Sequence, residues 1–134
     1  MIKTIRKLPI NYLPKTLSHK DRKTHIKSIS DNKIRPKVKS FKSSRSKWVK
    51  NFTRKYNKNI TNSKWINKHI LSHKGQRKVL NKGKGAYFSS GSRPNQTPQS
   101  WAYARLASVI MNGPARKIDK HIWKTHKMSI LTIP

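Results

Sequence analysis

Lysine and arginine are the residues most able to do chemistry in this chain, because they far outnumber the groups that could neutralise them. The 134 residues include 33 Lys and Arg but only three acids, Asp21, Asp31 and Asp119, which gives a formal net charge of +30. A compact domain with this charge repels itself, so an anionic partner is needed to offset it. Nucleic acid is the first candidate, because each phosphate that the protein neutralises releases condensed counterions. An anionic protein or lipid surface is the second.

The predicted anion-binding residues are basic side chains in the middle and the last third of the chain. They are Lys37, Lys39, Lys42, Arg45, Lys47, Lys50, Arg54, Lys55, Arg93, Arg116, Lys117 and Lys120. Binding through such residues is driven by charge and is insensitive to nucleotide sequence. Among them Trp48, Phe52 and Tyr56 recur at i, i+4 and i+8, and together with Trp65 they could stack on bases. A hydrophobic seam that docks on other helices is the commoner role of such a stripe.

Catalytic and metal-binding patterns are weak. Three scattered carboxylates cannot supply the acids of a two-metal centre, and the absence of Cys excludes thiolate ligands and a cysteine nucleophile. His69 and His73 have the i, i+4 spacing of two ligands on one helix face, but a zinc site needs at least a third ligand. We therefore expect no enzymatic activity, no metal and no cofactor. No apolar run approaches the roughly 18 residues of a transmembrane segment.

Three segments are expected to carry these side chains. Residues 1–42, rich in Lys and Arg and interrupted by three prolines, are predicted to form a basic extended arm with at most a weak helix from Ser18 to Ile29. Residues 43–74 are predicted to form two basic amphipathic helices. Ser43 or Ser44 is the expected N-cap of the first, and Thr61, Asn62 or Ser63 that of the second. Residues 75–134 are the expected C-terminal helical module, with its core at 85–126.

The composition changes sharply within this module. From Gly85 to Gly113 there is no Lys and no acid, and the only basic residues are Arg93 and Arg105. A buried helix explains the change, because each lysine in it would have to be desolvated. Thr97 and Pro98 have the types expected at a helix start, and Asn112 and Gly113 those expected at its end. The expected core or interface anchors are Trp101, Tyr103, Leu106, Ile110, Ile118 and Trp123.

Glycines and a proline on either side of this helix predict where the neighbouring elements end and begin. Gly75, Gly83 and Gly85 are expected to break the helical pattern before it, and Pro114 to open a second helix that completes a hairpin. Asp119 is expected on the surface of that second helix, paired with Arg116 one turn away. The predicted fold is therefore mainly α: a small C-terminal helical hairpin module with a long, largely extended basic N-terminal arm that carries two short amphipathic helices.

Two further patterns have both a functional and a structural interpretation. Residues 89–97, SSGSRPNQT, precede a helix N-terminus that could hold a phosphate, but they lack the spacing of a P-loop, and an ordered connecting loop is favoured. The helix, Asn-Gly turn and second helix have the spacing of a helix-turn-helix. A bare helical hairpin is the commoner outcome of that spacing, so sequence-specific readout is not favoured.

Residues 82–123 resemble a conserved, uncharacterised domain in small basic proteins of large double-stranded DNA viruses of protists and algae. The motifs that carry the resemblance are Ser90-Gly91-Ser92-Arg93-Pro94-Asn95-Gln96-Thr97-Pro98, Ser100-Trp101-Ala102, Ala104-Arg105-Leu106-Ala107-Ser108 and Lys117-Ile118-Asp119. They cover about a third of the chain. The resemblance implies a viral origin and a component of the virion, and it implies no activity and no ligand.

Charge and resemblance together predict a non-enzymatic structural protein of the virion, as a minor capsid, cement or core protein. Its expected partners are capsid or core proteins and nucleic acid, with packaged DNA favoured and no sequence specificity. The alternative is a ribosomal-type RNA-binding protein, which would also be small and basic with an extension that threads RNA.

Overall fold

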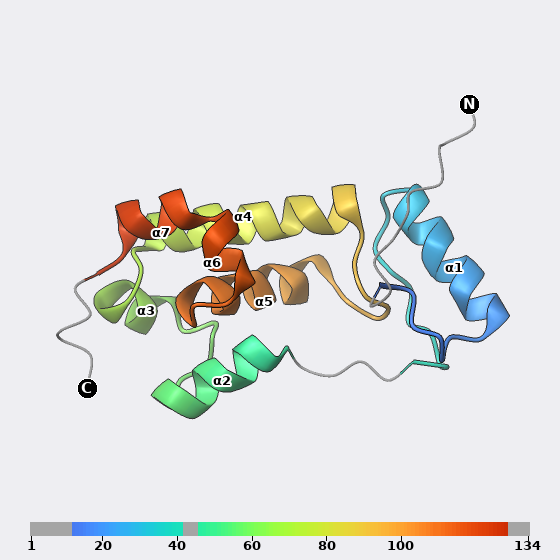
Figure 1. Ribbon diagram of the computed structural model, residues 1–134, viewed down its shortest axis with the longest axis horizontal. Coiled ribbons are helices and arrows are strands. Elements are labelled where there is room, and N and C mark those ends of the chain that lie inside the picture. The colour runs from blue at the N-terminus through green and yellow to red at the C-terminus, as the bar shows by residue number, and fades with distance from the viewer. Residues whose placement is uncertain (1–11, 42–45, 129–134) are drawn as a thin grey trace.

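The computed structural model describes residues 12–41 and 46–128, and the fold of this part is mainly helical (Figure 1). Its helices are α1 (His19–Ser30), α2 (Lys47–Tyr56), α3 (Ser63–His69), α4 (His73–Ser90), α5 (Pro98–Ile110), α6 (Pro114–Ile118) and α7 (Lys120–His126). Because helices are spread from residue 19 to residue 126, the predicted fold with a long extended N-terminal arm is wrong. The helix expected at Ser18–Ile29 forms as α1, with Ser18 as its N-cap.

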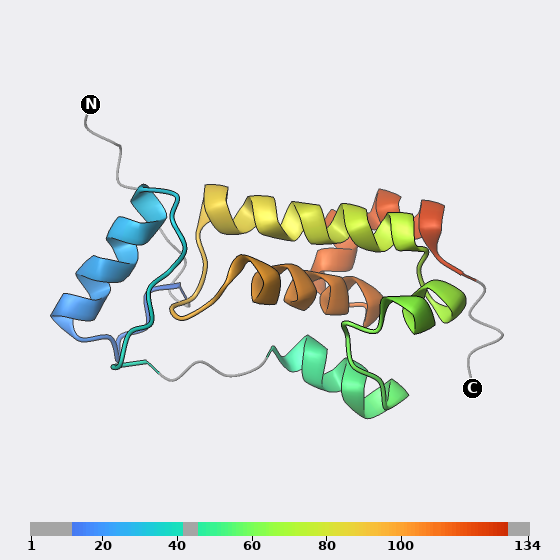
Figure 2. The ribbon, with the colours of Figure 1, turned by 180° about the vertical axis from the view of Figure 1, so that it is seen from behind.

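The centre of the fold is the antiparallel pair α4 and α5, which lie side by side in both ribbon views (Figures 1 and 2). The prediction that three glycines would break the chain before α5 is wrong, because all three lie inside α4. A Cβ added at Gly83 would lie 2.7 Å from the Cα of Ala102 on α5, and one at Gly75 would lie 2.5 Å from the Cβ of His126 on α7. Glycine at these positions therefore allows close approach between helices.

The core is completed by α2, which packs on α5, and by α3, which packs on α4, and their aromatic stripe contributes to it. Phe52, Ile66 and Leu106 are fully buried in one hydrophobic cluster. The ring of Phe52 lies 5.1 Å from that of Tyr56 and 6.2 Å from that of Trp65. Phe52, with the rings of Tyr56 and Trp65 packed against it, is therefore part of a hydrophobic seam, whereas Trp48 stays half-buried. The N-caps are Ser46 and Asn62, and the predicted caps Ser43 and Ser44 lie outside the described residues.

The start and the end of α5 follow the signals in the sequence. Thr97 and Ser100 form a reciprocal capping box, in which each side chain accepts from the other residue's backbone N–H, and Pro98 occupies the first helical position. Asn112 adopts a left-handed conformation with φ of 59°, as expected of a residue that ends a helix. Pro114 then opens α6.

The helix expected after Pro114 is divided at Asp119 into α6 and α7. Asp119 is 1% exposed, and its two carboxylate oxygens accept hydrogen bonds of 2.8 Å from Nε and Nη2 of Arg105 on α5. The predicted surface pair of Asp119 with Arg116 is therefore wrong, because the carboxylate turns toward α5. Ile118, expected as an anchor, is 69% exposed.

The segment after α1 folds back on the end of α4, which explains why residues 12–41 do not form an extended arm. The backbone N–H of Arg35 donates to the Tyr87 hydroxyl at 2.7 Å, and its Nη2 donates to the Tyr87 carbonyl at 2.5 Å. The same guanidinium lies 4.2 Å from the centre of the Tyr87 ring, a distance at which cation–π attraction is effective. Arg35 lies within the predicted arm, and it instead joins two parts of the fold.

The loop between α4 and α5 receives the rest of this segment. The Asn95 side chain accepts from the Val38 N–H at 2.6 Å and donates to the carbonyls of Val38 at 3.2 Å and Phe41 at 2.8 Å. His25 of α1 is buried, with its Nε2 3.0 Å from the carbonyl oxygen of Ser92. Residues 91–97 thus form an ordered connecting loop whose polar groups bind the N-terminal segment.

The two glycines in the middle of α4 make a matched test of this packing. Gly83→Ala is expected to lower the free energy of unfolding by about 1–3 kcal/mol, because the methyl group collides with the α5 backbone. Gly85→Ala is expected to raise it by about 0.5–1 kcal/mol, because nothing lies within 4 Å of the added Cβ and alanine is the better helix former. Urea unfolding measures both. Changes of the same sign would contradict the packing described.

A second prediction follows from the buried His25. Burial lowers the pKa of this imidazole from its ordinary value near 6.5, so the folded state favours the neutral ring. The contribution of His25 to the free energy of unfolding is therefore constant above about pH 6.5. It falls as the pH drops below that value, because the unfolded chain binds the proton more readily than the folded one.

Urea unfolding at pH 7.5 and pH 5.0 tests this dependence. The loss of stability at pH 5.0 is expected to be smaller in His25→Gln than in the natural chain, because glutamine does not titrate and keeps a donor for Ser92. An equal loss in the two proteins would contradict the assignment.

Candidate nucleic-acid interface

Lysines and arginines occupy different places in the described residues. Every lysine there is exposed. The arginines that are not exposed are Arg35, Arg105 and Arg116, and each of them binds groups of the protein itself. A guanidinium can donate several hydrogen bonds in one plane, whereas an ammonium is compact and strongly hydrated. The fold therefore uses arginine for internal contacts and leaves lysine in the solvent.

The carboxylates do not neutralise this lysine surface. Asp119 is buried against Arg105, and Lys82 Nζ lies 3.7 Å from it; these are the ion pairs within 4 Å in the described part of the chain. Asp21 accepts from the backbone N–H and the hydroxyl of Ser40 at 3.0 and 2.6 Å, and these hydrogen bonds lower the pKa of its carboxyl. Nearly all exposed cations in this part are thus available to an external anion.

The face formed by α4 and α7 concentrates part of this charge. Ser72, the N-cap of α4, donates its backbone N–H to the carbonyl of His126 at 3.1 Å, so the end of α7 lies against the start of α4. Burial lowers the pKa of His126, and the nearby Lys78, Lys74 and His121 lower it further. We use the name α4–α7 face for the exposed basic residues of these two helices and of the C-cap of α7, which are Lys74, Arg77, Lys78, Lys82, Lys84, Lys120, His121, Lys124 and Lys127.

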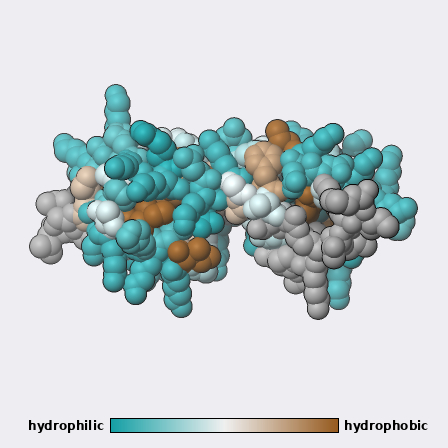
Figure 3. Space-filling model, turned by 90° about the horizontal axis from the view of Figure 1, so that it is seen from above, coloured by the Kyte–Doolittle hydropathy of each residue, from teal (hydrophilic) through white to brown (hydrophobic). Residues whose placement is uncertain are grey.

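The surface seen from the side of α4 and α7 is mostly hydrophilic, with a few apolar spots (Figure 3). Most residues of the α4–α7 face were missed by sequence reasoning, because the glycines suggested that 75–85 is not helical. Along an α-helix the eight residue steps from Lys74 to Lys82 rise about 12 Å, which corresponds to roughly three to four phosphates of one DNA strand measured along the duplex axis.

The predicted anion-binding residues do not form one site. Lys37 and Lys39 lie in the segment after α1, Lys47, Lys50, Arg54 and Lys55 on α2, Arg93 in the α4–α5 loop, Lys117 on α6 and Lys120 on α7, and all of them are exposed. Lys42 and Arg45 lie outside the described residues. Of the predicted anchors, Leu106, Ile110 and Trp123 are buried, whereas Trp101 and Tyr103 are half-buried.

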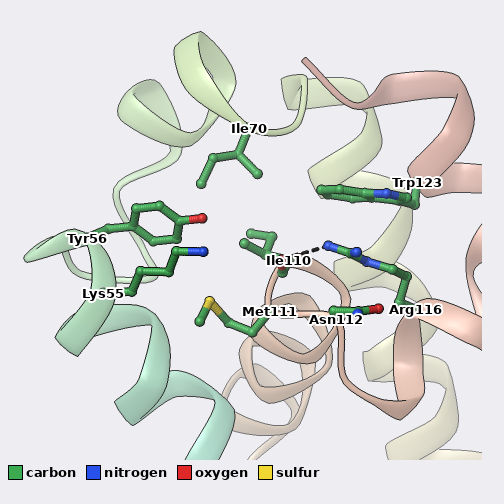
Figure 4. Close-up of a pocket in the computed structure, with 8 residues that line it drawn as sticks. All are labelled: Lys55, Tyr56, Ile70, Ile110, Met111, Asn112, Arg116 and Trp123. Atoms are coloured by element: carbon green, nitrogen blue, oxygen red, sulfur yellow. Dashed lines mark hydrogen bonds between the residues drawn. The ribbon is translucent and has the colours of Figure 1, made fainter. Parts of the chain in front are cut away.

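One pocket does bring two of the predicted anion-binding residues together, Lys55 from α2 and Arg116 from α6 (Figure 4). It has a volume of about 220 Å³ and lies at the C-terminal end of α5. In Figure 4 the Lys55 ammonium and the Tyr56 hydroxyl point into it from one wall, and Arg116 approaches from the opposite wall. The residues that line the pocket include no acid. The arrangement suits a small oxyanion such as one phosphate group.

Arg116 has a structural role in this pocket. Its Nε and Nη2 donate to the carbonyls of Val109 and Ile110, both at 2.8 Å, and its guanidinium lies 4.0 Å from the centre of the Trp123 ring. It thus binds carbonyls at the end of α5 that have no partner within the helix. Burial lowers its pKa. The sequence predicted a phosphate-contacting residue here, and the structure uses it first as a helix cap.

The histidine pair does not lie on one helix. His69 belongs to α3 and stacks on Trp65 with ring centres 4.9 Å apart, whereas His73 is the first residue of α4 and its Nδ1 lies 2.7 Å from the Ser63 hydroxyl. Within the described residues, no three His, Asp or Glu side chains gather in an arrangement suited to a metal ion.

Comparison with known proteins identifies the family. A family of unknown function, DUF5824, matches residues 12–125. The chain belongs to this family. The DUF5824 match extends beyond residues 82–123 and includes α1 and the segment that docks on α4, so the docked N-terminal part lies within the family's unit. No curated protein and no solved structure matches the chain significantly.

The helices of this DUF5824 chain, so far as they are described, are too short or too polar for any of them to span a bilayer.

Two variants test whether Arg116 stabilises the fold at this pocket while the exposed Lys55 does not. Arg116→Lys is expected to lower the free energy of unfolding by about 1.5–3 kcal/mol, because the charge is retained but the two carbonyls lose their hydrogen-bond donors. Lys55→Gln is expected to change it by less than about 0.5 kcal/mol, because Lys55 is exposed. Thermal and urea unfolding measure both. Equal stability of Arg116→Lys and the natural chain would contradict the capping role.

Proposed function

We propose that this DUF5824 protein is a non-enzymatic structural component of the virion of a large DNA virus, in which it binds packaged DNA through its basic helical surface. The observation that carries the proposal is the uncompensated charge: the chain has a net charge of +30, and every described lysine is exposed. Such a surface gains free energy from a polyanion by releasing condensed counterions.

The positions of the acids support the DNA part of the proposal. Asp119 forms an ion pair with Arg105, and Asp21 accepts a hydrogen bond from the Ser40 hydroxyl. With only three acids against 33 Lys and Arg, and with Asp119 paired to Arg105, little negative charge is left to repel DNA. Three scattered carboxylates also cannot supply the acids of a two-metal centre. Binding without chemistry is the function that these side chains support best.

The virion part of the proposal rests on the resemblance of residues 82–123 to small basic proteins of large DNA viruses. The motifs of that resemblance lie in the α4–α5 loop, on α5 and at the α6–α7 junction, which form the frame of the fold. Within a particle the same surface can also bind acidic patches of capsid or core proteins, since attraction to such patches uses the same lysines.

The α4–α7 face is proposed as the main DNA-binding surface, because its exposed lysines lie on two helices that pack against each other. A duplex carries negative charge at short, regular intervals. A row of lysines along α4 with a second row on α7 can therefore neutralise several phosphates at once without contacting base edges.

DNA binding should depend steeply on salt. If about six to ten phosphates are neutralised, affinity for a duplex is expected to fall by roughly 10³–10⁵ between 50 and 200 mM salt. In the variant Lys74→Gln/Lys78→Gln/Lys124→Gln, the slope of log affinity against log salt is expected to decrease by about 2.7, which is about 0.9 for each phosphate that is no longer neutralised. Fluorescence anisotropy with a labelled duplex measures both.

A matched control places the interface on the molecule. Lys20→Gln/Lys23→Gln/Lys27→Gln removes the same charge from α1, where all three lysines are exposed, and is expected to change the slope less. Equal effects of the two triple variants would contradict the α4–α7 face as the main surface.

A shallow slope in the natural chain, together with binding to washed capsid proteins, would favour a protein partner over DNA. Preferential binding to structured RNA over duplex DNA would favour a ribosomal-type function.

A further inference from the structure

A second concave region lies beside α5 and differs from the α4–α7 face in chemistry. It has a volume of about 790 Å³ and is bordered by α5, the N-terminal end of α2, the 59–61 turn and the α4–α5 loop. The ribbon seen from behind shows α2 below α5 and this loop at the start of α5 (Figure 2). We call it the aromatic groove. Its volume lies within the range of pockets that bind organic ligands, roughly 300–1,000 Å³.

Aromatic side chains from three parts of the chain line the aromatic groove. They are Tyr12, Trp48 of α2, and Trp101 and Tyr103 of α5, and all four are half-buried. Trp101 meets Tyr12 edge-on with ring centres 5.6 Å apart. Trp48 is held against the α5–α6 turn, since a Cβ added at Gly113 would lie 2.8 Å from its Cε2. These rings are fixed by their contacts and are only partly covered.

Cationic groups accompany these rings. Arg93 is exposed on the groove lining. It lies close enough to Tyr12 to oppose the rise in the pKa of that phenol that burial causes. The Lys47 ammonium lies 4.8 Å from the centre of the Trp48 ring. Among its described residues the lining contains no carboxylate, and its other polar groups are mostly neutral hydroxyls and amides. The ligand that this surface suits is flat, apolar on its faces and negatively charged.

We infer that the aromatic groove binds unpaired bases of single-stranded nucleic acid, with Trp101 and its neighbouring rings stacking on bases and Arg93 and Lys47 contacting phosphates. The inference rests on the proposed function, in which nucleic acid is the partner, and adds a preference within that class. Stacking on aromatic side chains combined with a cationic lining is the usual basis of single-strand binding that tolerates any sequence. Paired bases within a duplex do not expose their faces and therefore cannot use this groove.

An apolar peptide of a protein partner is a less suitable occupant. A peptide able to approach a chain of net charge +30 would have to be acidic, and its carboxylates would gain little from the neutral polar groups and the large ring surface of the groove. A nucleotide carries its charge on the phosphate and its flat faces on the base. This separation suits a lining that holds Arg93 near Tyr12 and also contains the ring of Trp101.

The test compares three labelled ligands of equal length on the full chain at one moderate salt concentration: an oligo-dT strand, an abasic strand with the same phosphates, and a duplex. The natural chain is expected to bind oligo-dT roughly tenfold or more tightly than the abasic strand, because the latter offers charge without bases. Trp101→Leu is expected to remove most of that difference and to leave duplex binding unchanged.

Trp65→Leu makes the same change on α3, outside the aromatic groove, and is expected to retain the preference. Because a tryptophan variant can lose stability, a second measurement uses the natural chain alone. Ultraviolet cross-linking to a bromouracil-containing strand, followed by mass spectrometry of the peptides, is expected to mark residues 93–105 or 46–49.

The outcomes distinguish this inference from the function on which it rests. Equal affinity for the abasic strand and oligo-dT, or cross-links only on α4 and α7, would overturn the aromatic groove as a base-binding site while leaving DNA binding intact. Failure to bind any of the three ligands at 50 mM salt would overturn both.

Discussion

The contact between α4 and α5 at Gly83 determines how the rest of the structure is arranged. The two backbones approach so closely that a methyl group on Gly83 would lie 2.7 Å from the Cα of Ala102. This approach places the buried core between these helices and α2 and α3. It also brings Tyr87, near the end of α4, to the position where the segment after α1 can bind it. The α4–α7 face and the aromatic groove are both formed around this pair.

The sequence predicted those elements whose signals are local. The start of α5 at Thr97 and Pro98 was predicted because capping depends on residues within one turn. The helical course of α4 was missed, because the role of Gly83 depends on Ala102, which is 19 positions away in the chain. The extended arm was predicted wrongly for a similar reason, since the groups that hold Arg35 lie 52 residues further on.

The candidate site was predictable to the same limited extent. Excess charge correctly indicated a cationic surface, because composition alone decides how few carboxylates are available. Which cations remain on that surface depends on the fold. Arg116 is adjacent to Lys117 in sequence, yet the first binds carbonyls at the end of α5 and the second is exposed. The lysines of α4 were missed together with the helix that aligns them.

The separation of arginine from lysine has a consequence for how the charge of this protein can be regulated. Acylation of a lysine amine removes its positive charge and leaves arginine unaltered. Because the buried cationic contacts are made by Arg35, Arg105 and Arg116, and the described lysines are exposed, acylating enzymes or reagents would reach these lysine amines without opening the fold. The overall charge of the folded chain is thus a property that covalent modification can reduce stepwise, while the helices and their packing stay the same.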